Sequence, residues 1–291
     1  MDRRTFIASA LTATGTMITF GAFKTAIENQ KGEEALMPAM FVGHGSPMNA
    51  IEQNEFSKTW KLEADKLPVP KAILCVSAHW FTRGTYVAIT PKPETIHDFG
   101  GFPQALFDVQ YPSPGSPDLA HFTKNIITST EVKEDNEWGL DHGTWSVLAQ
   151  MYPMANIPVY QLSIDYTKPP AFHYQIGKEL LELRKKGVLV IGSGNIVHNL
   201  GMIDFRNQNS AYDWALEFDD KIKGFLADGN HQAVINYEAL GKAAKLSVPS
   251  NDHYLPLLYT IGLQQKNEGI GFFNEKSMMG SISMRSVKIS G

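Results

Sequence analysis

The sequence predicts an α/β fold: a single domain whose central sheet is mostly parallel or mixed and is flanked by helices on both faces. Short apolar runs typical of buried strands alternate along the chain with segments whose apolar residues recur at helical spacing. Such alternation favours a sheet that is covered on both sides. The chain has 291 residues with no internal repeat and no linker, so we expect one domain over residues 36–291.

The first half of this domain begins with an expected strand at 38–42 that runs directly into Gly43 and His44. A helix is expected at 52–67, because Phe56 and Trp60 lie on one face at helical spacing. The further elements expected in this half are strands at 71–77, 86–89 and 158–163 and helices at 118–128 and 144–151. A long loop at 91–117 separates them, and its aromatic residues argue against disorder and for a functional loop.

The second half starts with a strongly amphipathic pattern at 171–186, which predicts one helix, followed at once by a buried strand at 188–191. The remaining expected elements are helices at 212–228, 232–240 and 253–265 and a closing edge strand at 281–288. The sequence therefore predicts strand ends at several places where histidines follow.

The first 28 residues are expected to be an export signal and not part of the fold. Arg3 and Arg4 precede a moderately apolar stretch rich in Ala, Thr and Gly, which is similar to a twin-arginine signal. This predicts an exported, periplasmic protein. The alternative is an uncleaved N-terminus that anchors the protein to the membrane.

Composition excludes several classes of function. The net charge of −4 gives no basic surface for nucleic acid, and no Lys/Arg run beyond the leader indicates a stable membrane partner. The single cysteine, Cys75, excludes an intrachain disulfide and a zinc site of paired cysteines. It lies in an apolar run and is expected to be a buried core residue.

Four histidines lie where the apolar strands end or a helix begins: His44, His79, His198 and His253. In an open α/β sheet, ligands bind in the crevice beyond the carboxyl ends of the strands. Histidine is the commonest protein metal ligand. The pattern therefore predicts one metal site, with His44, His79 and His253 as ligands.

Two histidines are candidates for acid/base work. His198 ends a Gly-Ser-Gly-Asn turn, and His142 lies between Asp141 and Gly143, where Asp141 is expected to orient it. His97 lies in the long loop, where a role beside a substrate and a structural role are both open. Three further histidines have polar neighbours on expected helices and are expected at the surface: His121, His173 and His231.

At these residues the chain resembles the class III extradiol ring-cleavage dioxygenases, in the 4,5-DOPA dioxygenase-like branch. Six motifs occur in family order: Gly43-His44-Gly45-Ser46-Pro47, Ser77-Ala78-His79-Trp80, His97-Asp98-Phe99-Gly100-Gly101-Phe102-Pro103, Leu140-Asp141-His142-Gly143-Thr144-Trp145, Gly192-Ser193-Gly194-Asn195-Ile196-Val197-His198-Asn199-Leu200 and His253-Tyr254-Leu255-Pro256-Leu257-Leu258.

The resemblance implies one divalent metal per chain, held by His44, His79 and His253. It places His198 close by as a fourth ligand or an acid/base residue, and His142 beside substrate or oxygen. The founding enzymes complete the site with a carboxylate, whereas here His253 stands at that position. Since an all-histidine set suits Zn(II) as well as Fe(II), both metals remain open.

The activity implied is cleavage of a catechol-type ring, such as that of a DOPA-like substrate, with incorporation of both atoms of O2. A zinc-dependent hydrolase on the same residues and a non-catalytic exported protein that binds a metal or a phenol are the alternatives. The expected partners are a small catechol and O2, and the oligomeric state is left open.

Overall fold

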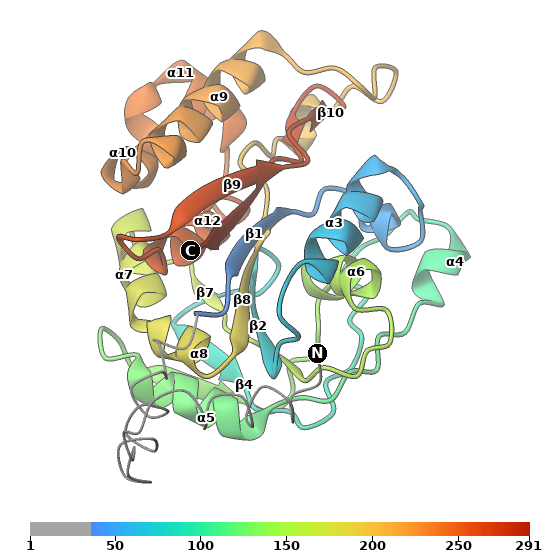
Figure 1. Cartoon of the computed structure of the whole chain (residues 1–291). Helices are drawn as coiled ribbons and strands as arrows, with labels where there is room; N and C mark the ends of the chain where they lie inside the picture. Colours follow the sequence, from blue (N-terminus) through green and yellow to red (C-terminus); the bar gives the residue numbers. More distant parts are fainter. Residues whose placement is uncertain (1–35) are drawn as a thin grey trace, which may run out of the picture. The chain divides into compact units, whose positions relative to one another are not determined.

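The computed structural model describes residues 36–291, and the expected export signal at 1–28 lies outside the described residues. A six-stranded sheet forms the centre of this unit (Figure 1), with strands in the order β6-β2-β8-β1-β12-β9. In chain order these strands are β1 (Ala39–Gly43), β2 (Ala72–Ser77), β6 (Val159–Gln161), β8 (Val188–Gly194), β9 (Gly269–Phe273) and β12 (Ser286–Ser290).

The sheet is mixed. β6, β2, β8 and β1 pair in parallel, whereas β12 pairs antiparallel with both β1 and β9. The predicted fold class is confirmed. The expectation of a closing edge strand at 281–288 is wrong, because β12 lies inside the sheet and the edge is β9. The sequence of β9 is Gly-Ile-Gly-Phe-Phe, and its two glycines obscure a strand pattern.

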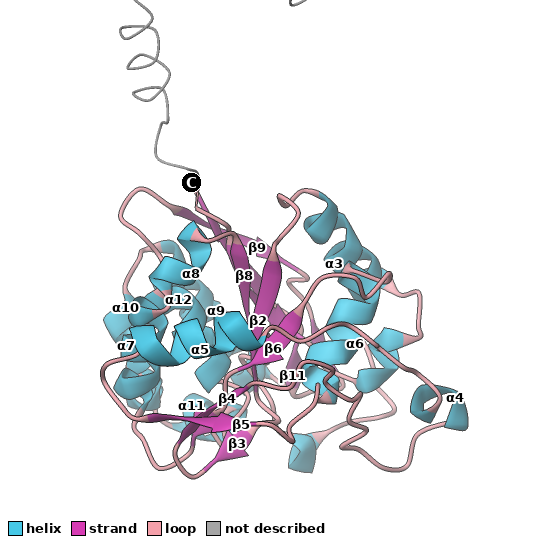
Figure 2. Ribbon diagram, turned by 90° about the horizontal axis from the view of Figure 1, so that it is seen from below, coloured by secondary structure: helices cyan, strands magenta, loops and turns pink. Residues whose placement is uncertain are grey.

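Helices cover both faces of the sheet (Figure 2). On β1, Met40 and Val42 belong to the core formed with α3 (Glu55–Asp65) and α6 (His142–Met151), while Ala39 and Phe41 belong to the opposite core. Because successive residues of a strand point to opposite faces, a continuous apolar run contributes side chains to the cores on both faces of the sheet. The helices of the opposite core are α5 (Pro117–Ile126), α7 (Pro170–Glu179), α8 (Leu181–Lys185), α9 (Asp213–Ala227), α10 (His231–Ile235), α11 (Lys242–Ser247) and α12 (Leu255–Gly262).

Short elements complete the unit. The expected strand at 86–89 is β4, which pairs with β5 in a separate two-stranded sheet and not in the central sheet. The long loop at 91–117 is irregular except for one short helix. These short elements are η1 (Pro47–Ala50), β3 (Phe81–Thr82), β4 (Thr85–Ala88), α4 (Gln104–Phe107), β5 (Val132–Asp135), β7 (Ile164–Asp165), η2 (Leu200–Met202), η3 (Tyr237–Leu240), β10 (Ser277–Met278) and β11 (Ile282–Ser283).

The amphipathic segment at 171–186 forms two helices, α7 and α8, instead of the one expected. Each is anchored by a different neighbour. Gly177 on α7 lies so close to α12 that a Cβ there would be 2.3 Å from the Tyr259 carbonyl oxygen. Arg184 on α8 is buried, and its guanidinium bonds the Met37 and Leu263 carbonyls and the Glu268 carboxylate. The spacing of apolar residues in the sequence does not show that the two halves of this segment contact different neighbours.

Cys75 is buried and unpaired, as expected, and His121 is exposed. The surface prediction is wrong for the other two histidines. His173 is fully buried on α7, where its Nδ1 lies 3.0 Å from the Tyr259 hydroxyl. His231 is half-buried between Tyr174 and Gln264. Among residues 36–291, no helix combines the length and the apolarity that a membrane span requires.

His173 gives a testable pH dependence of stability. Burial lowers its pKa from 6.5 to about 4. Between pH 6.5 and about pH 4, His173 is protonated in the unfolded chain but stays neutral in the folded chain. The free energy of unfolding therefore falls as the pH falls through this range. His173→Phe lacks this contribution. The difference in free energy of unfolding between the parent protein and His173→Phe should therefore narrow by roughly 3 kcal/mol from pH 7 to pH 4.

Urea unfolding at a series of pH values measures this gap. Tyr259→Phe is the matched control, because it removes the hydroxyl that His173 contacts and keeps the buried imidazole. It should keep the pH dependence of the parent protein. An equal gap at pH 7 and pH 4 for His173→Phe would contradict the prediction.

Candidate metal centre

His44 is positioned at the end of β1, where the strand stops beside β8. Its backbone N–H donates to the Gly194 carbonyl at 3.1 Å. Its side chain is 1% exposed, and Nδ1 lies 3.0 Å from the Ser193 hydroxyl oxygen. Since that hydroxyl donates its own hydrogen to the Gly143 carbonyl at 2.6 Å, it accepts from His44 Nδ1–H. In the neutral ring, Nε2 of His44 therefore carries the lone pair.

His253 reaches the same place from the turn before α12. The Asn195 N–H, just beyond β8, donates to its carbonyl at 2.9 Å. A Cβ on Gly194 would lie 2.1 Å from that carbonyl oxygen, so only glycine permits the approach. The Asp252 carboxylate lies 2.7 Å from His253 Nδ1, and this bond holds the pKa of Asp252 well below its usual range although burial alone would raise it. This pairing also leaves Nε2 of His253 free.

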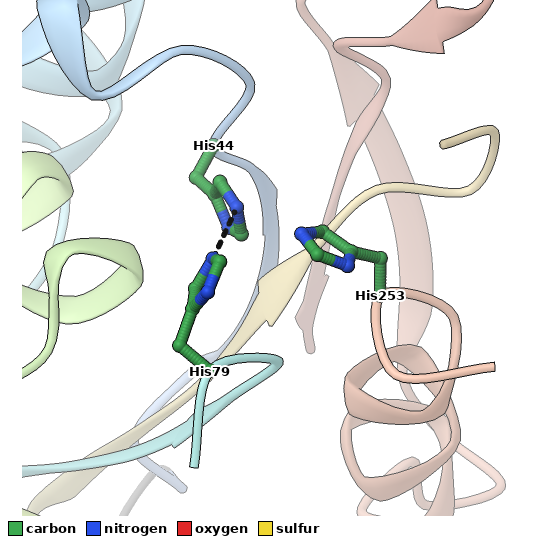
Figure 3. Close-up of side chains that lie close together, drawn as sticks. All are labelled: His44, His79 and His253. Atoms are coloured by element: carbon green, nitrogen blue, oxygen red, sulfur yellow. Dashed lines mark hydrogen bonds between the residues drawn. The ribbon is translucent and has the colours of Figure 1, made fainter. Parts of the chain in front are cut away.

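His79 follows β2 and completes the cluster, which we call the three-histidine centre: His44, His79 and His253. The ligand nitrogens of these residues all lie within 4.8 Å of one another. Figure 3 shows the three rings pointing toward one another, with Nε2 of His44 and Nε2 of His79 3.2 Å apart. Three strand-following or helix-preceding segments that are distant in the chain thus supply one compact donor set.

The chemistry of this donor set fits a divalent cation. Burial, together with the neighbouring imidazoles, holds the pKa of His44 and of His79 well below the usual value, so both rings are neutral. Neutral imidazole nitrogens are good ligands for both Zn(II) and Fe(II). Nε2 of His44 and Nε2 of His79 are within hydrogen-bond distance of each other, so one divalent cation could be reached by both rings. The residues present therefore suit a metal held by His44, His79 and His253.

His198 lies beside this centre and not among its donors. Its ring stacks on that of His253, with centroids 3.5 Å apart and an interplanar angle of 8°. Its backbone N–H donates to the Ser247 carbonyl at 2.9 Å. Burial and the neighbouring His253 lower the pKa of His198 to about 3. The stacked geometry favours the acid/base alternative over a fourth ligand.

His142 lies next to His79 of the three-histidine centre, at the start of α6. Its ring centroid is 3.8 Å from that of His79. Its Nδ1 and its backbone N–H both lie 2.9 Å from Oδ1 of Asp98. Asp98 stands in the third of the six family motifs, but the sequence gives it no role, because its contact depends on how the loop at 91–117 folds back.

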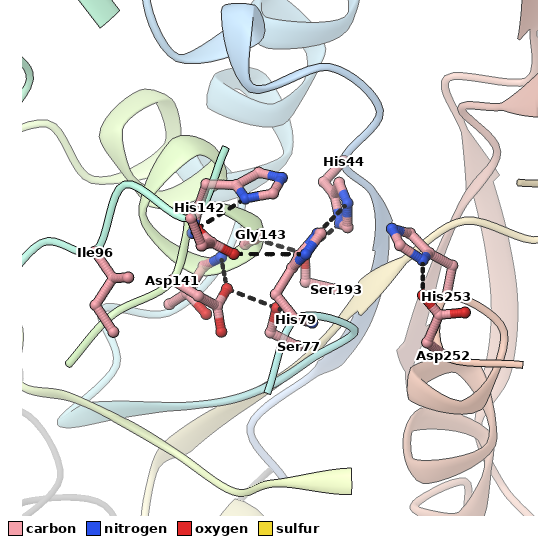
Figure 4. A network of polar contacts seen from close by, with 12 residues as sticks. His44, Ser77, His79, Ile96, Asp141, His142, Gly143, Ser193, Asp252 and His253 are labelled. Carbon is pink, nitrogen blue, oxygen red and sulfur yellow. Dashed lines mark hydrogen bonds and ion pairs between the residues drawn. The ribbon is translucent and has the colours of Figure 1, made fainter. Parts of the chain in front are cut away.

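The expectation that Asp141 orients His142 is wrong. The Asp141 carboxylate is buried, and it accepts from the Ser77 hydroxyl at 2.6 Å and from the Gln161 amide at 2.7 Å. It also caps α6 through the Thr144 N–H. Figure 4 shows it directed away from the His142 ring. Its place in the described structure is that of an N-cap that ties α6 to β2 and β6.

Aromatic residues of the long loop line the side of the centre at His142. Phe99 packs edge-on against the His142 ring, with centroids 5.5 Å apart, and it also contacts Phe102 and Phe107. The His97 ring contacts Phe99 and Phe107, and its Nε2 lies 3.0 Å from the Val109 carbonyl. The loop is thus an ordered aromatic wall beside the three-histidine centre.

The buried histidine donor set at the ends of the parallel strands makes this edge of the mixed sheet a candidate site for a divalent metal. Comparison with known proteins identifies the class of protein. The family described as the catalytic LigB subunit of aromatic ring-opening dioxygenase matches residues 37–284. The chain therefore belongs to this family and is an extradiol ring-cleaving dioxygenase. The resemblance noted from the six motifs is confirmed.

Individual relatives agree with this assignment. The chain is 47% identical to the 4,5-DOPA dioxygenase extradiol of Escherichia coli K12, over 87% of this chain and 94% of that protein. It is 35% identical to the 4,5-DOPA dioxygenase extradiol of Beta vulgaris, over 89% and 98% of the two chains. A solved structure of an uncharacterized Escherichia coli K12 protein is similar, with a TM-score of 0.76 and 41% identity, and the match covers 87% of this chain and 99% of that one.

Proposed function

We propose that this protein is a metal-dependent extradiol dioxygenase that cleaves a DOPA-like catechol with O2. The observation that carries the proposal is the three-histidine centre, in which Nδ1 of His44 and of His253 is engaged by Ser193 and Asp252, respectively. Such second partners fix the ring orientation and leave Nε2 for the metal. The names of the relatives from Escherichia coli K12 and Beta vulgaris support a DOPA-like substrate.

In this proposal His44, His79 and His253 hold one divalent metal per chain. Bound Fe(II) supplies the redox chemistry between the catechol and O2. His198, beside His253, and His142, beside His79, serve as proton carriers: one accepts the proton of a catechol hydroxyl, and the other is available to return a proton to the opening ring. The aromatic wall around Phe99 receives the substrate ring and excludes water.

The metal dependence can be tested by loading the metal-free protein with Fe(II) or with Zn(II) under anaerobic conditions, adding DOPA, and then admitting oxygen. We expect oxygen uptake and a yellow ring-fission product with Fe(II) alone, because Zn(II) has no redox chemistry. Oxygen electrode traces and absorbance spectra measure both. A panel of other catechols, run in parallel, reports the substrate preference.

The other outcomes separate the alternatives. Absence of oxygen uptake with every catechol in the Fe(II) protein would overturn the proposal. Hydrolysis of ester or amide substrates by the Zn(II) protein would then indicate a zinc hydrolase, in which the metal activates water. Binding of a catechol with no turnover under either metal would indicate a binding protein.

A further inference from the structure

We propose that Asp98 is a positioning residue that fixes the tautomer of His142 and thereby presents its Nε2 as the proton acceptor of the site. The proposal deepens the proposed function, and it rests on that function for the identity of the reaction. Its structural basis lies in the contacts of one carboxylate with two histidines that come from different elements.

The first contact is between the Asp98 carboxylate and two nitrogens of His142, the backbone nitrogen and the side-chain Nδ1. Oδ1 of Asp98 lies 2.9 Å from the backbone N–H of His142 and 2.9 Å from its Nδ1. A carboxylate oxygen only accepts hydrogen bonds, so Nδ1 of His142 must carry the hydrogen. In the neutral ring the other nitrogen, Nε2, then has the free lone pair and is able to accept a proton.

The second contact joins this ring to the three-histidine centre. Oδ2 of Asp98 lies 3.6 Å from Nδ1 of His79, which is too long for a hydrogen bond. The His79 and His142 rings are themselves 3.8 Å apart between centroids. One carboxylate therefore holds a proton carrier at a fixed place beside a metal ligand.

The remaining surroundings of His142 leave this task to Asp98. Asp141, the adjacent carboxylate, is occupied by Ser77, Gln161 and the start of α6. Phe99, the next residue after Asp98, packs edge-on against the His142 ring and offers no acceptor. The orientation of the ring is thus set by Asp98 on its polar side and by Phe99 on its apolar side.

The test compares Asp98→Ala with Asp98→Asn in the full chain. Nitrogen NMR of histidine-labelled, Zn(II)-loaded protein reports the tautomer, and His142→Asn identifies the signals of His142. We expect His142 to be an Nδ1–H tautomer in the parent protein and in Asp98→Asn, whose amide oxygen can still accept, and to lose this preference in Asp98→Ala. In the Fe(II) protein kcat should fall roughly 10–100-fold in Asp98→Ala with little change in KM, and Asp98→Asn should recover part of the loss.

Asp108→Asn is the matched control, because Asp108 is an exposed aspartate of the same loop whose carboxylate bonds only the Gln104 side chain among the described residues. It should behave as the parent protein does. An unchanged tautomer or an unchanged kcat in Asp98→Ala would overturn the proposal. So would two bound metal ions in the parent protein and one in Asp98→Ala, since His79, Asp98 and His142 would then be ligands of a second ion.

The NMR measurement distinguishes a failure of the inference about Asp98 from a failure of the proposed function. If the parent protein turns over no catechol, the proposed function fails, and the tautomer of His142 in the Zn(II) protein still decides the role of Asp98. If the parent protein is active and the tautomer is unaffected by Asp98→Ala, only the inference about Asp98 fails.

Discussion

Replacing His253 with alanine is expected to abolish both metal binding and ring cleavage. The variant keeps two of the three donors, His44 and His79, and leaves the Asp252 carboxylate without its partner. Loss of a residue that merely supports a ligand typically costs 10–100-fold in affinity or activity, so loss of a ligand itself should cost more than about 100-fold. Metal analysis after dialysis and oxygen uptake with DOPA measure the two effects.

His121→Ala is the control for this experiment, because His121 is an exposed histidine on α5 that contacts Glu134. It should retain one equivalent of metal and full turnover. Retention of one equivalent of tightly bound metal by His253→Ala would contradict the assignment of His253 as a ligand. Circular dichroism spectra of the variants check that α12, which begins two residues later, is intact.

Replacing His198 with phenylalanine is expected to remove turnover and spare the metal. The phenyl ring preserves the stacking on His253 and carries no nitrogen that can accept or donate a proton. General acid–base catalysis contributes about 10²–10⁴-fold, and kcat should fall by a factor in that range. Metal analysis should still find one equivalent per chain.

The same pair of measurements decides between the two roles left open for His198. Loss of the metal along with activity would make His198 a fourth ligand and contradict the expected result. Normal turnover in His198→Phe would remove His198 from the proton-transfer steps and leave His142 as the proton carrier. His198→Asn, which restores a polar side chain without the stacking ring, tests whether the stacking alone supports the centre.

Much of the fold follows from sequence pattern. The buried parallel strands are continuous apolar runs, and the pattern predicts β1 and β2 at nearly their observed bounds. It predicts the start of β8 but ends that strand three residues early, before Gly192. The antiparallel edge was not predicted. The glycines of β9 weaken its pattern, and the place of β12 depends on a partner that lies elsewhere in the chain. Tertiary pairing, which local sequence does not encode, decides the order of these strands.

The three-histidine centre was predictable for a topological reason. Parallel strands end at a common edge, so histidines placed just after such strands meet there irrespective of their separation in sequence. The residues around this centre were harder to predict from the sequence. Asp141 stands next to His142 in sequence, yet the helix turn directs its carboxylate elsewhere, and the loop brings Asp98 to the ring instead. The export signal at 1–28 stays a prediction.

The assembly of the centre from positions 44, 79 and 253 links metal supply to folding. No short fragment of the chain contains all three donors, so the site exists only when β1, β2 and the start of α12 are in place together. A ligand that binds only the folded state stabilises it, by about 2.7 kcal/mol at a hundredfold excess over Kd. In the proposed function the metal therefore links residues from both ends of the domain, and removing it should lower the free energy of unfolding as well as the activity.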